Sequence, residues 1–413
     1  MKAGLAPLRH REFRLLFAGR TTSLVGSAMA PVALAFAVLD VTGSKTDLGL
    51  VLAAREVPLV AFLLAGGIWA DRLPRNHVMV GANLLSALSQ AAAAALLLTG
   101  TAEIWHLAAL AAVNGSASAF YFPASAGVIP QTVPAPLLQQ ANALLGLSVN
   151  ATQIGGAALG GLLVAGFSPG IAIAVDAATY ILAGSILAQM RLELGAAEMR
   201  HFFSELAAGW REFRSRTWLW AIVLQFSLML GVVIGSFSVL GPVVADEKLG
   251  GAAAWGLVLT ANAAGFVAGG LLGLRWRPRR MLLVATLAIL LMPFTLIALG
   301  FPLPLLAIVA AAFVGGFGIE IFGLLWNTTM QQEIPPRLLS RVYSYDALGS
   351  FVLVPVGLAA AGPVAELIGV RATLWGAAGI AIGVTLAVLV VRDVRTLERK
   401  PHFEELPAAT SSP

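Results

Sequence analysis

The 413-residue sequence contains no cysteine, few charged residues and no histidine deep within its apolar runs. Without thiolates the chain forms neither disulfides nor iron–sulfur or zinc–thiolate sites, and it has no intramembrane histidine relay. Charged residues make up 11% of the chain and hydrophobic residues 58%, against about 25% and about 45–50% in soluble domains. So few charges cannot cover a soluble protein of this size, which indicates a chain that lies mostly in a lipid bilayer.

Apolar runs of about 20 residues, the length that crosses a bilayer core, recur along the chain between charges and turn residues. Twelve spans are predicted, at residues 13–39, 48–70, 77–99, 104–127, 137–166, 169–190, 217–243, 252–274, 280–300, 303–331, 341–366 and 371–391. The first run is too long for the apolar region of a cleaved signal peptide, so we expect it to remain as a span. The fold class expected is an all-α polytopic membrane protein with twelve transmembrane helices.

The net charge of +5 could indicate a nucleic-acid partner, but the positive charges lie in the loops between apolar runs. When the twelve spans alternate, 22 of the 26 lysines and arginines fall on the side of the N-terminus and three on the other side, with Arg55 inside a span. Positive loops are typical of the cytoplasmic side. We therefore expect a plasma-membrane protein with both termini in the cytoplasm and no nucleic-acid partner.

The two halves of the chain repeat each other with an offset of 203 to 205 residues. Gly66-Gly67 corresponds to Gly269-Gly270, and Ile129-Pro130 corresponds to Ile334-Pro335. The repeat predicts two six-helix bundles, at residues 1–190 and 217–392, joined by a linker at 191–216 and followed by a cytoplasmic tail at 393–413. The linker carries apolar residues at helical spacing, which predicts an amphipathic helix on the membrane surface. Parallel six-helix halves around a midplane site are one architecture of secondary transporters.

With these spans and this repeat, the chain resembles the major facilitator superfamily over residues 9–395. The loop after the second span matches the family signature at Gly67, Asp71, Arg72 and Arg75. Within the superfamily the chain looks most like the branch of the enterobactin exporter and macrolide efflux proteins. The stretches that carry this similarity are Phe122-Pro123-Ala124, Gln140-Ala141-Asn142, Asp176-Ala177 and Arg341-Val342-Tyr343-Ser344.

The resemblance implies that Asp71 faces the start of the eleventh span, near Arg341, only while the bundles are closed on the cytoplasmic side. There the helix N-terminus would stabilise the carboxylate, and the loop would act as a conformational latch. The alternative is a charged loop that only sets topology. The chain departs from the family in one motif that is typical of antiporters. Residues 156–161 keep the glycines of this motif but have alanine in place of its helix-kinking proline, which weakens the inference of antiport without removing it.

Ionisable residues inside a span are costly and need a partner, water or a proton. Glu320, deep in the tenth span, is the first candidate for proton coupling, with a structural carboxylate as the alternative. Asp176 and Glu56 are further candidates, although a structural role is favoured for Asp176. Arg55 and Glu56 are adjacent, so their side chains diverge by about 100° on a helix and are expected to be poor partners for each other.

Amides beside aromatic rings suit an amphiphilic organic ligand. The candidate residues of a substrate cavity are Asn114, Tyr121, Asn150, Trp326 and Asn327. Packing between helices explains the aromatic residues equally well, and the fifth span carries a stripe of small and polar residues that also suits a close helix–helix contact.

No ATPase domain, cofactor motif or metal-ligand set is recognisable, and no nucleophile lies beside a histidine in the spans. We therefore expect a monomeric secondary transporter, not an enzyme, that uses no cofactor and exports a hydrophobic or amphiphilic small molecule, such as a drug or siderophore, by proton antiport. The alternative is a non-transporting membrane sensor or assembly factor that keeps the fold.

Overall fold

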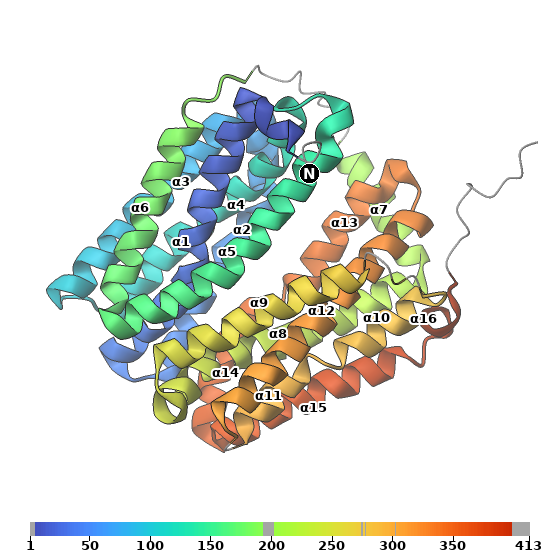
Figure 1. Cartoon of the computed structure of the whole chain (residues 1–413). Helices are drawn as coiled ribbons and strands as arrows, with labels where there is room; N and C mark the ends of the chain where they lie inside the picture. The colour runs from blue at the N-terminus through green and yellow to red at the C-terminus, as the bar shows by residue number, and fades with distance from the viewer. Residues whose placement is uncertain (1–4, 193–201, 274–275, 277, 302, 399–413) are drawn as a thin grey trace, which may run out of the picture.

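The computed structural model describes residues 5–192, 202–273, 276, 278–301 and 303–398, with side chains outside that description at 63–72, 202–208, 336, 337 and 340. The described part is all-helical (Figure 1). The first six long helices are α1 (Arg11–Thr42), α2 (Lys45–Arg72), α3 (Arg75–Thr99), α4 (Ile104–Val128), α5 (Leu138–Gly166) and α6 (Pro169–Leu187). After α7 (Phe202–Ser215) come α8 (Thr217–Val244), α9 (Ala252–Gly273), α10 (Met281–Ile289), α11 (Pro293–Gly300), α12 (Leu305–Glu333), α13 (Pro336–Phe351), α14 (Val354–Ile368), α15 (Val370–Val388) and the short α16 (Arg392–Thr396).

Local sequence signals set the ends of several helices. Gly43 and Gly100 end α1 and α3 with positive φ values of 65° and 70°, a conformation that favours glycine at a helix C-terminus. Before α6, the Ser168 hydroxyl accepts a hydrogen bond from the Ile171 amide, and Pro169 takes the first helical position. These caps place the turns between spans where the apolar runs end.

Among the described residues, eleven helical segments are long and apolar enough to cross a membrane. The one predicted span that is not among these eleven, the second, at 48–70, corresponds to α2, a helix of 28 residues whose last ten side chains lie outside the description. The prediction of an all-α polytopic membrane protein with twelve transmembrane helices in two six-helix bundles is confirmed.

Two spans predicted as single helices are broken in the structure. The span at 280–300 divides into α10 and α11 at Leu290–Met292, and the span at 341–366 begins earlier, at Pro336, and divides into α13 and α14. Pro293 and Pro355 lie just after the two breaks. Because proline lacks an N–H and clashes with the carbonyl four residues before it, each one interrupts the helix there.

The packing of the helices repeats in the two halves. In the first bundle α1 packs against α5 and α6, and α4 packs against α2 and α3. In the second bundle α8 packs against α14 and α15, and α12 packs against α9 and α10. The contacts between bundles repeat as well, since α5 packs on α9 and α14 packs on α2. The sequence repeat is therefore also a repeat of helix packing.

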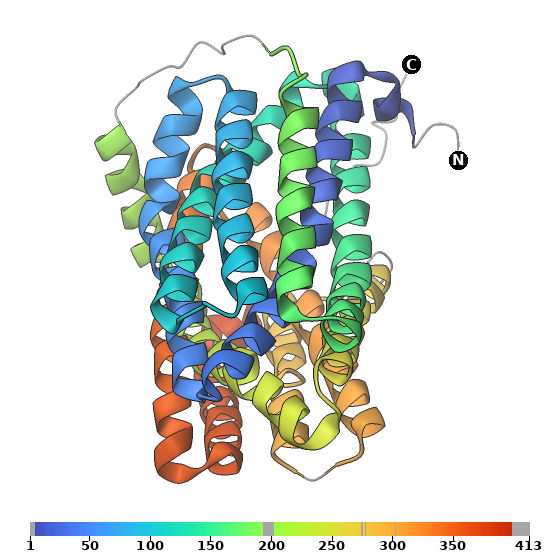
Figure 2. The same ribbon diagram turned by 90° about the vertical axis from the view of Figure 1, so that its left-hand side faces the viewer.

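We define the terminus side as the end of the molecule where α1 begins, and the far side as the end where α2 begins. The contacts between bundles lie on the far side. There Thr46 of α2 donates a 2.7 Å hydrogen bond to Glu366 of α14, and Gly161 of α5 lies against Gly256 of α9. Figure 1 shows α5 and α9 meeting at one end and diverging toward the N-terminus, and Figure 2 shows the bundles from another side. The chain is therefore closed on the far side.

The linker at 191–216, for which an amphipathic helix is predicted, contains α7 over Phe202–Ser215, and described residues of this helix contact the second bundle. The ring centroid of Tyr345 in α13 lies 5.3 Å from that of Trp210 and 6.0 Å from that of Phe213. Gly209 lies so close to Arg341 that an added Cβ would be 2.7 Å from the Cβ of Arg341. The described end of the apolar face of α7, at Trp210 and Phe213, is therefore packed on the second bundle.

Candidate functional site

A cavity of about 320 Å³ lies between the two bundles. Its lining comes from α1, α2, α3, α4 and α6 on one wall and from α8, α9, α13 and α14 on the other. Arg55 and Asn114 each lie ten residues from the far-side start of their helix, or about 15 Å at 1.5 Å per residue. This depth is near the middle of a bilayer core of about 30 Å.

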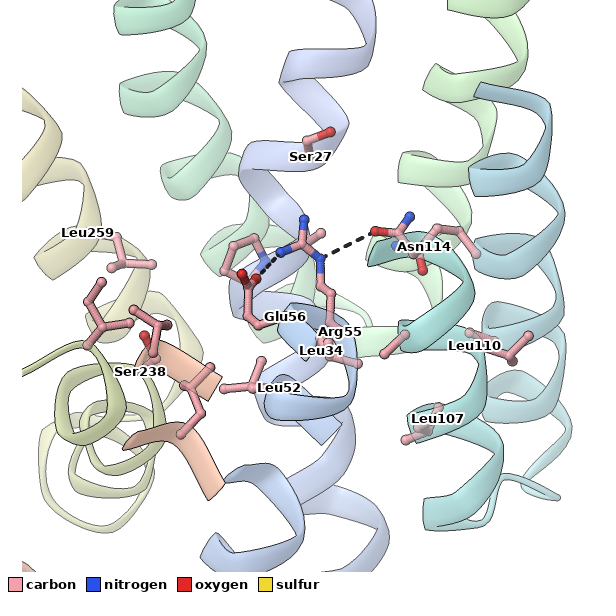
Figure 3. Close-up of a pocket in the computed structure, with 18 of the residues that line it drawn as sticks. Ser27, Leu34, Leu52, Arg55, Glu56, Leu107, Leu110, Asn114, Ser238 and Leu259 are labelled. Carbon is pink, nitrogen blue, oxygen red and sulfur yellow. Dashed lines mark hydrogen bonds and ion pairs between the residues drawn. The ribbon is translucent and has the colours of Figure 1, made fainter. Parts of the chain in front are cut away.

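An ion pair occupies one wall of this cavity. The guanidinium of Arg55 lies 2.5 Å from the carboxylate of Glu56, and Figure 3 shows both groups beside Asn114. The expectation that these adjacent side chains would be poor partners is wrong. Their Cβ atoms diverge, but the long arginine stem carries the guanidinium back to its neighbour, which avoids placing two unpaired charges at this depth.

Asn114 joins the ion pair to α4. Its Oδ1 atom accepts a hydrogen bond of 3.4 Å from the Nε atom of Arg55. Gly115 makes this approach possible, because an added Cβ would clash with the backbone carbonyl of Arg55. Asn114 is 5% exposed, and its amide nitrogen has no hydrogen-bond partner among the described residues, although it lies near the Tyr180 hydroxyl. Asn114 and Glu56 are the two predicted site residues that line this cavity.

Glu320 lies elsewhere in the second bundle. Its side chain, neither fully buried nor fully exposed, packs on the small residues Gly269 and Gly270 of α9. Its carboxylate has no hydrogen bond or ion pair with any other residue that the structure describes. Glu320 is therefore a carboxylate within a span that lacks a cationic partner in the described part of the chain, and it does not line the cavity beside Arg55.

Asp176 is buried among helices of the first bundle. It is 1% exposed, and its Oδ2 atom accepts a 2.6 Å hydrogen bond from Gln90 of α3. Gly26 of α1 approaches the other carboxylate oxygen so closely that a Cβ there would lie 2.3 Å from it. That oxygen has no hydrogen-bond partner in the described structure. These contacts agree with the structural role favoured for Asp176.

Two further cavity candidates belong to the first bundle. Tyr121 packs against the bundle core, and its hydroxyl is buried with no hydrogen bond to a described residue. Asn150 is exposed on α5. It shares a helix face with Ile154, Ala157 and Gly161, which contact α9 nearer the far side. Asn150 therefore lies on the face of α5 that points toward α9, but at a level where the two bundles have separated and the residue is exposed.

Trp326 and Asn327 do not line the cavity beside Arg55. Trp326 is 5% exposed and packs against Trp218, with ring centroids 5.6 Å apart. Asn327 is exposed and donates a hydrogen bond to the carbonyl of Gly323 in its own helix. The indole N–H of Trp326 donates a 3.1 Å hydrogen bond to Asp346. Asp346 was missed at the sequence level, although an acid six residues into the predicted span 341–366 was the signal that could have found it.

The latch residues are only partly described. Gly67, Asp71 and Arg72 belong to the last turns of α2, but their side chains lie outside the described part of the structure. Arg75, at the start of α3, donates a hydrogen bond to the carbonyl of Gly127 at the end of α4. Arg341 lies in α13 beside α7. The contact between Asp71 and the region of Arg341 therefore stays a prediction.

Two bundles of equivalent packing around a shared cavity define the class of this protein as a membrane transporter of the major facilitator fold. In agreement, the nucleoside transporter NupG superimposes with a TM-score of 0.73 over 92% of this chain and 98% of that one, at 14% identity, which shows the fold alone.

The family model described as "Transmembrane secretion effector" matches residues 2–409. The chain belongs to this family of the major facilitator superfamily, which confirms that it is a multi-pass transporter and not an enzyme.

Three relatives are similar over most of their length. Macrolide efflux protein A of Streptococcus pyogenes is 24% identical, covering 94% of this chain and 98% of the relative. The multidrug efflux pump Tap of Mycolicibacterium fortuitum is 29% identical, covering 87% and 90%. The enterobactin exporter EntS of Shigella boydii is 26% identical, covering 95% and 94%. The resemblance to this branch, expected from short sequence stretches, is confirmed.

Proposed function

We propose that this transporter exports a hydrophobic or amphiphilic small molecule across the plasma membrane in exchange for protons. The cavity of about 320 Å³ between the bundles carries this proposal. A mainly apolar pocket with a few placed polar groups suits a small organic ligand. The relatives named for efflux of macrolides, of several drugs and of enterobactin support export as the direction.

We assign the terminus side to the cytoplasm, because most lysines and arginines lie in the loops on that side. Residues 1–190 and 217–392 then form the two bundles, and the linker 191–216 and the tail 393–413 are cytoplasmic. The far-side contacts close the exit to the exterior. The ligand would enter from the cytoplasm, and rocking of the bundles about the cavity would expose it to the other side. One chain contains both bundles, so it would act as a monomer.

Glu320 is our candidate for the proton that is exchanged. It lies within the span α12 and lacks a cationic partner among the described residues, so it can take up a proton without breaking an ion pair. Glu56 is already paired with Arg55, and Asp176 is held by Gln90. Of the three carboxylates proposed for coupling, Glu320 is therefore the one whose protonation disturbs no ion pair or hydrogen bond among the described residues.

A sensor or assembly factor that keeps the fold is the alternative, and it predicts a cavity filled by side chains. The open volume beside Arg55 favours the transporter.

The test is transport by the purified protein in vesicles with an imposed proton gradient, using a panel of cationic, neutral and anionic fluorescent amphiphiles. We expect gradient-driven accumulation of at least one compound. Glu320→Gln should abolish it without changing insertion, whereas Glu398→Gln, at a carboxylate 65% exposed near Arg280, should have no effect. No accumulation of any compound by the unaltered protein would contradict transport, and undiminished accumulation by Glu320→Gln would contradict its role.

A further inference from the structure

The two walls of the cavity differ in polarity. The first bundle supplies the titratable and amide groups, whereas the second supplies mainly large apolar side chains. The polar side chains of the first wall are Ser27, Arg55, Glu56, Gln90, Asn114 and Tyr180. The opposite wall contains Phe237 and Trp255, whose ring centroids lie 4.9 Å apart. A ligand in this cavity therefore meets polar groups on one side and aromatic rings on the other.

The polar wall has more hydrogen-bond donors than acceptors to satisfy them. A guanidinium carries five N–H groups, and Arg55 directs one to Glu56 and one to Asn114. Its other N–H groups have no acceptor among the described residues. The amide nitrogen of Asn114 is also buried, and the polar group near it is the Tyr180 hydroxyl, which already shares a hydrogen bond with Ser27.

Most acceptors of this wall are already occupied. Ser27 and Tyr180 are hydrogen-bonded to each other at 2.9 Å, and one oxygen of Glu56 is taken by Arg55. The second oxygen of Glu56 could meet a cation, but that cation would lie beside the positive charge of Arg55. In Figure 3 the guanidinium lies between Glu56 and Asn114, with Ser27 above it. The acceptors left on this wall are the second oxygen of Glu56 and the amide oxygen of Gln90, whose nitrogen donates to Asp176. Neither accepts from the remaining N–H groups of Arg55, so a ligand would have to supply the acceptors for them.

We infer that the transported ligand is an amphiphile whose polar end is an anionic or uncharged acceptor group, bound by Arg55 and Asn114. A carboxylate, a phenolate or an amide carbonyl has this chemistry, and a guanidinium binds planar oxygen pairs well. The apolar body of the ligand lies against Phe237 and Trp255. This inference rests on the proposed function, because it names the class of molecule that the same cavity carries.

Three probes with one skeleton separate the possible polar ends: 4-(1-pyrenyl)butyrate, the corresponding butyramide and the corresponding butylamine. Their binding is measured with the full chain in lipid nanodiscs, corrected with empty nanodiscs. We expect the acid and the amide to bind more tightly than the amine. Arg55→Gln should weaken binding of the acid at least tenfold and should not weaken binding of the amine, because it leaves Glu56 without its cationic partner. Arg371→Gln is the matched control, since Arg371 stacks on Trp375 outside this cavity.

Glu56→Gln gives a second test that does not depend on the folding of the Arg55 variant. Removing the competing carboxylate frees Arg55, so binding of the acid should become several-fold tighter. Tightest binding of the amine, or acid binding that is unchanged by both variants, would overturn the inference. Export of the cationic compounds alone in the vesicle assay would overturn the ligand class and leave the proposed function intact, whereas no transport of any compound would overturn the function itself.

Discussion

Gly161 of α5 and Gly256 of α9 meet across the interface of the two bundles, where a Cβ added to either residue would lie 3.0 Å from the Cα of the other. A carbonyl lies even closer to each added Cβ, at 2.8 Å. The far side is therefore closed by direct backbone contact, which only residues without a side chain allow. A larger side chain at either glycine therefore has to push the two bundles apart.

The first prediction is that Gly161→Leu shifts the protein toward a conformation open on the far side. Overpacking costs about 1–3 kcal/mol, and about 1.4 kcal/mol is tenfold in an equilibrium, so we expect a shift of about tenfold or more. Spin labels on cysteines introduced at the exposed Phe167 and Lys248 should report a longer distance. Gly155→Leu is the control, because nothing lies within 4 Å of an added Cβ at Gly155. Equal distances in both variants would contradict the prediction.

The second prediction concerns the hydrogen bond from Thr46 to Glu366, which joins the bundles on the same side. Net hydrogen bonds contribute about 0.5–1.5 kcal/mol, and Glu366 is exposed, so the lower value applies. Thr46→Val should shift the same equilibrium about twofold, measured with the same spin-label pair. Thr42→Val, which removes only local bonds of the first bundle, to the carbonyl of Val38 and from the amide of Ser44, serves as the control. Additive effects of Thr46→Val and Glu366→Gln in a double-mutant cycle would show that the two residues do not interact.

Much of the fold was predictable from the sequence. The lengths of the apolar spans and the charges of the loops follow from the bilayer, and the repeat of the two halves is visible as matching residues 203 to 205 positions apart. The breaks before Pro293 and Pro355 also had a visible signal, since proline interrupts a helix wherever its missing N–H is needed. The exact bends were missed because an apolar run continues through both breaks without a charge.

The site was less predictable. Asn114 and Glu56 line the cavity, but Trp326 is packed inside the second bundle, because a tryptophan in an apolar helix suits packing as well as ligand binding. The pairing of Arg55 with Glu56 was missed because Cβ directions do not describe where a long, flexible side chain ends. Which face of a helix lines a cavity depends on helix packing, and one sequence does not reveal it.

The third prediction separates a structural Asp176 from a coupling one. Asp176→Leu leaves the donor of the half-buried Gln90 without its partner, which costs up to about 1–3 kcal/mol, so the melting temperature in detergent should fall. Asp176→Asn keeps an oxygen for Gln90 and should retain gradient-driven transport. The matched control is Ser185→Ala, at a residue of the same helix whose hydroxyl donates only to the backbone carbonyl of Ile181, one turn before it. Loss of coupling in Asp176→Asn with unchanged melting would instead assign the proton to Asp176.

The last prediction tests the latch. If Asp71 stabilises the state closed on the terminus side through the N-terminus of a facing helix, an interaction of about 0.3–1 kcal/mol, Asp71→Asn should favour the opposite state about two- to fivefold. A single cysteine placed at Asn150, which is exposed where the bundles separate, should then react faster with a thiol reagent added from the terminus side, and the chain has no native cysteine to interfere. Asp47→Asn, in the first turn of the same helix α2, should leave the rate unchanged. If labelling in Asp71→Asn is unchanged or slower, the carboxylate does not hold that side closed, and the loop has only its topological role.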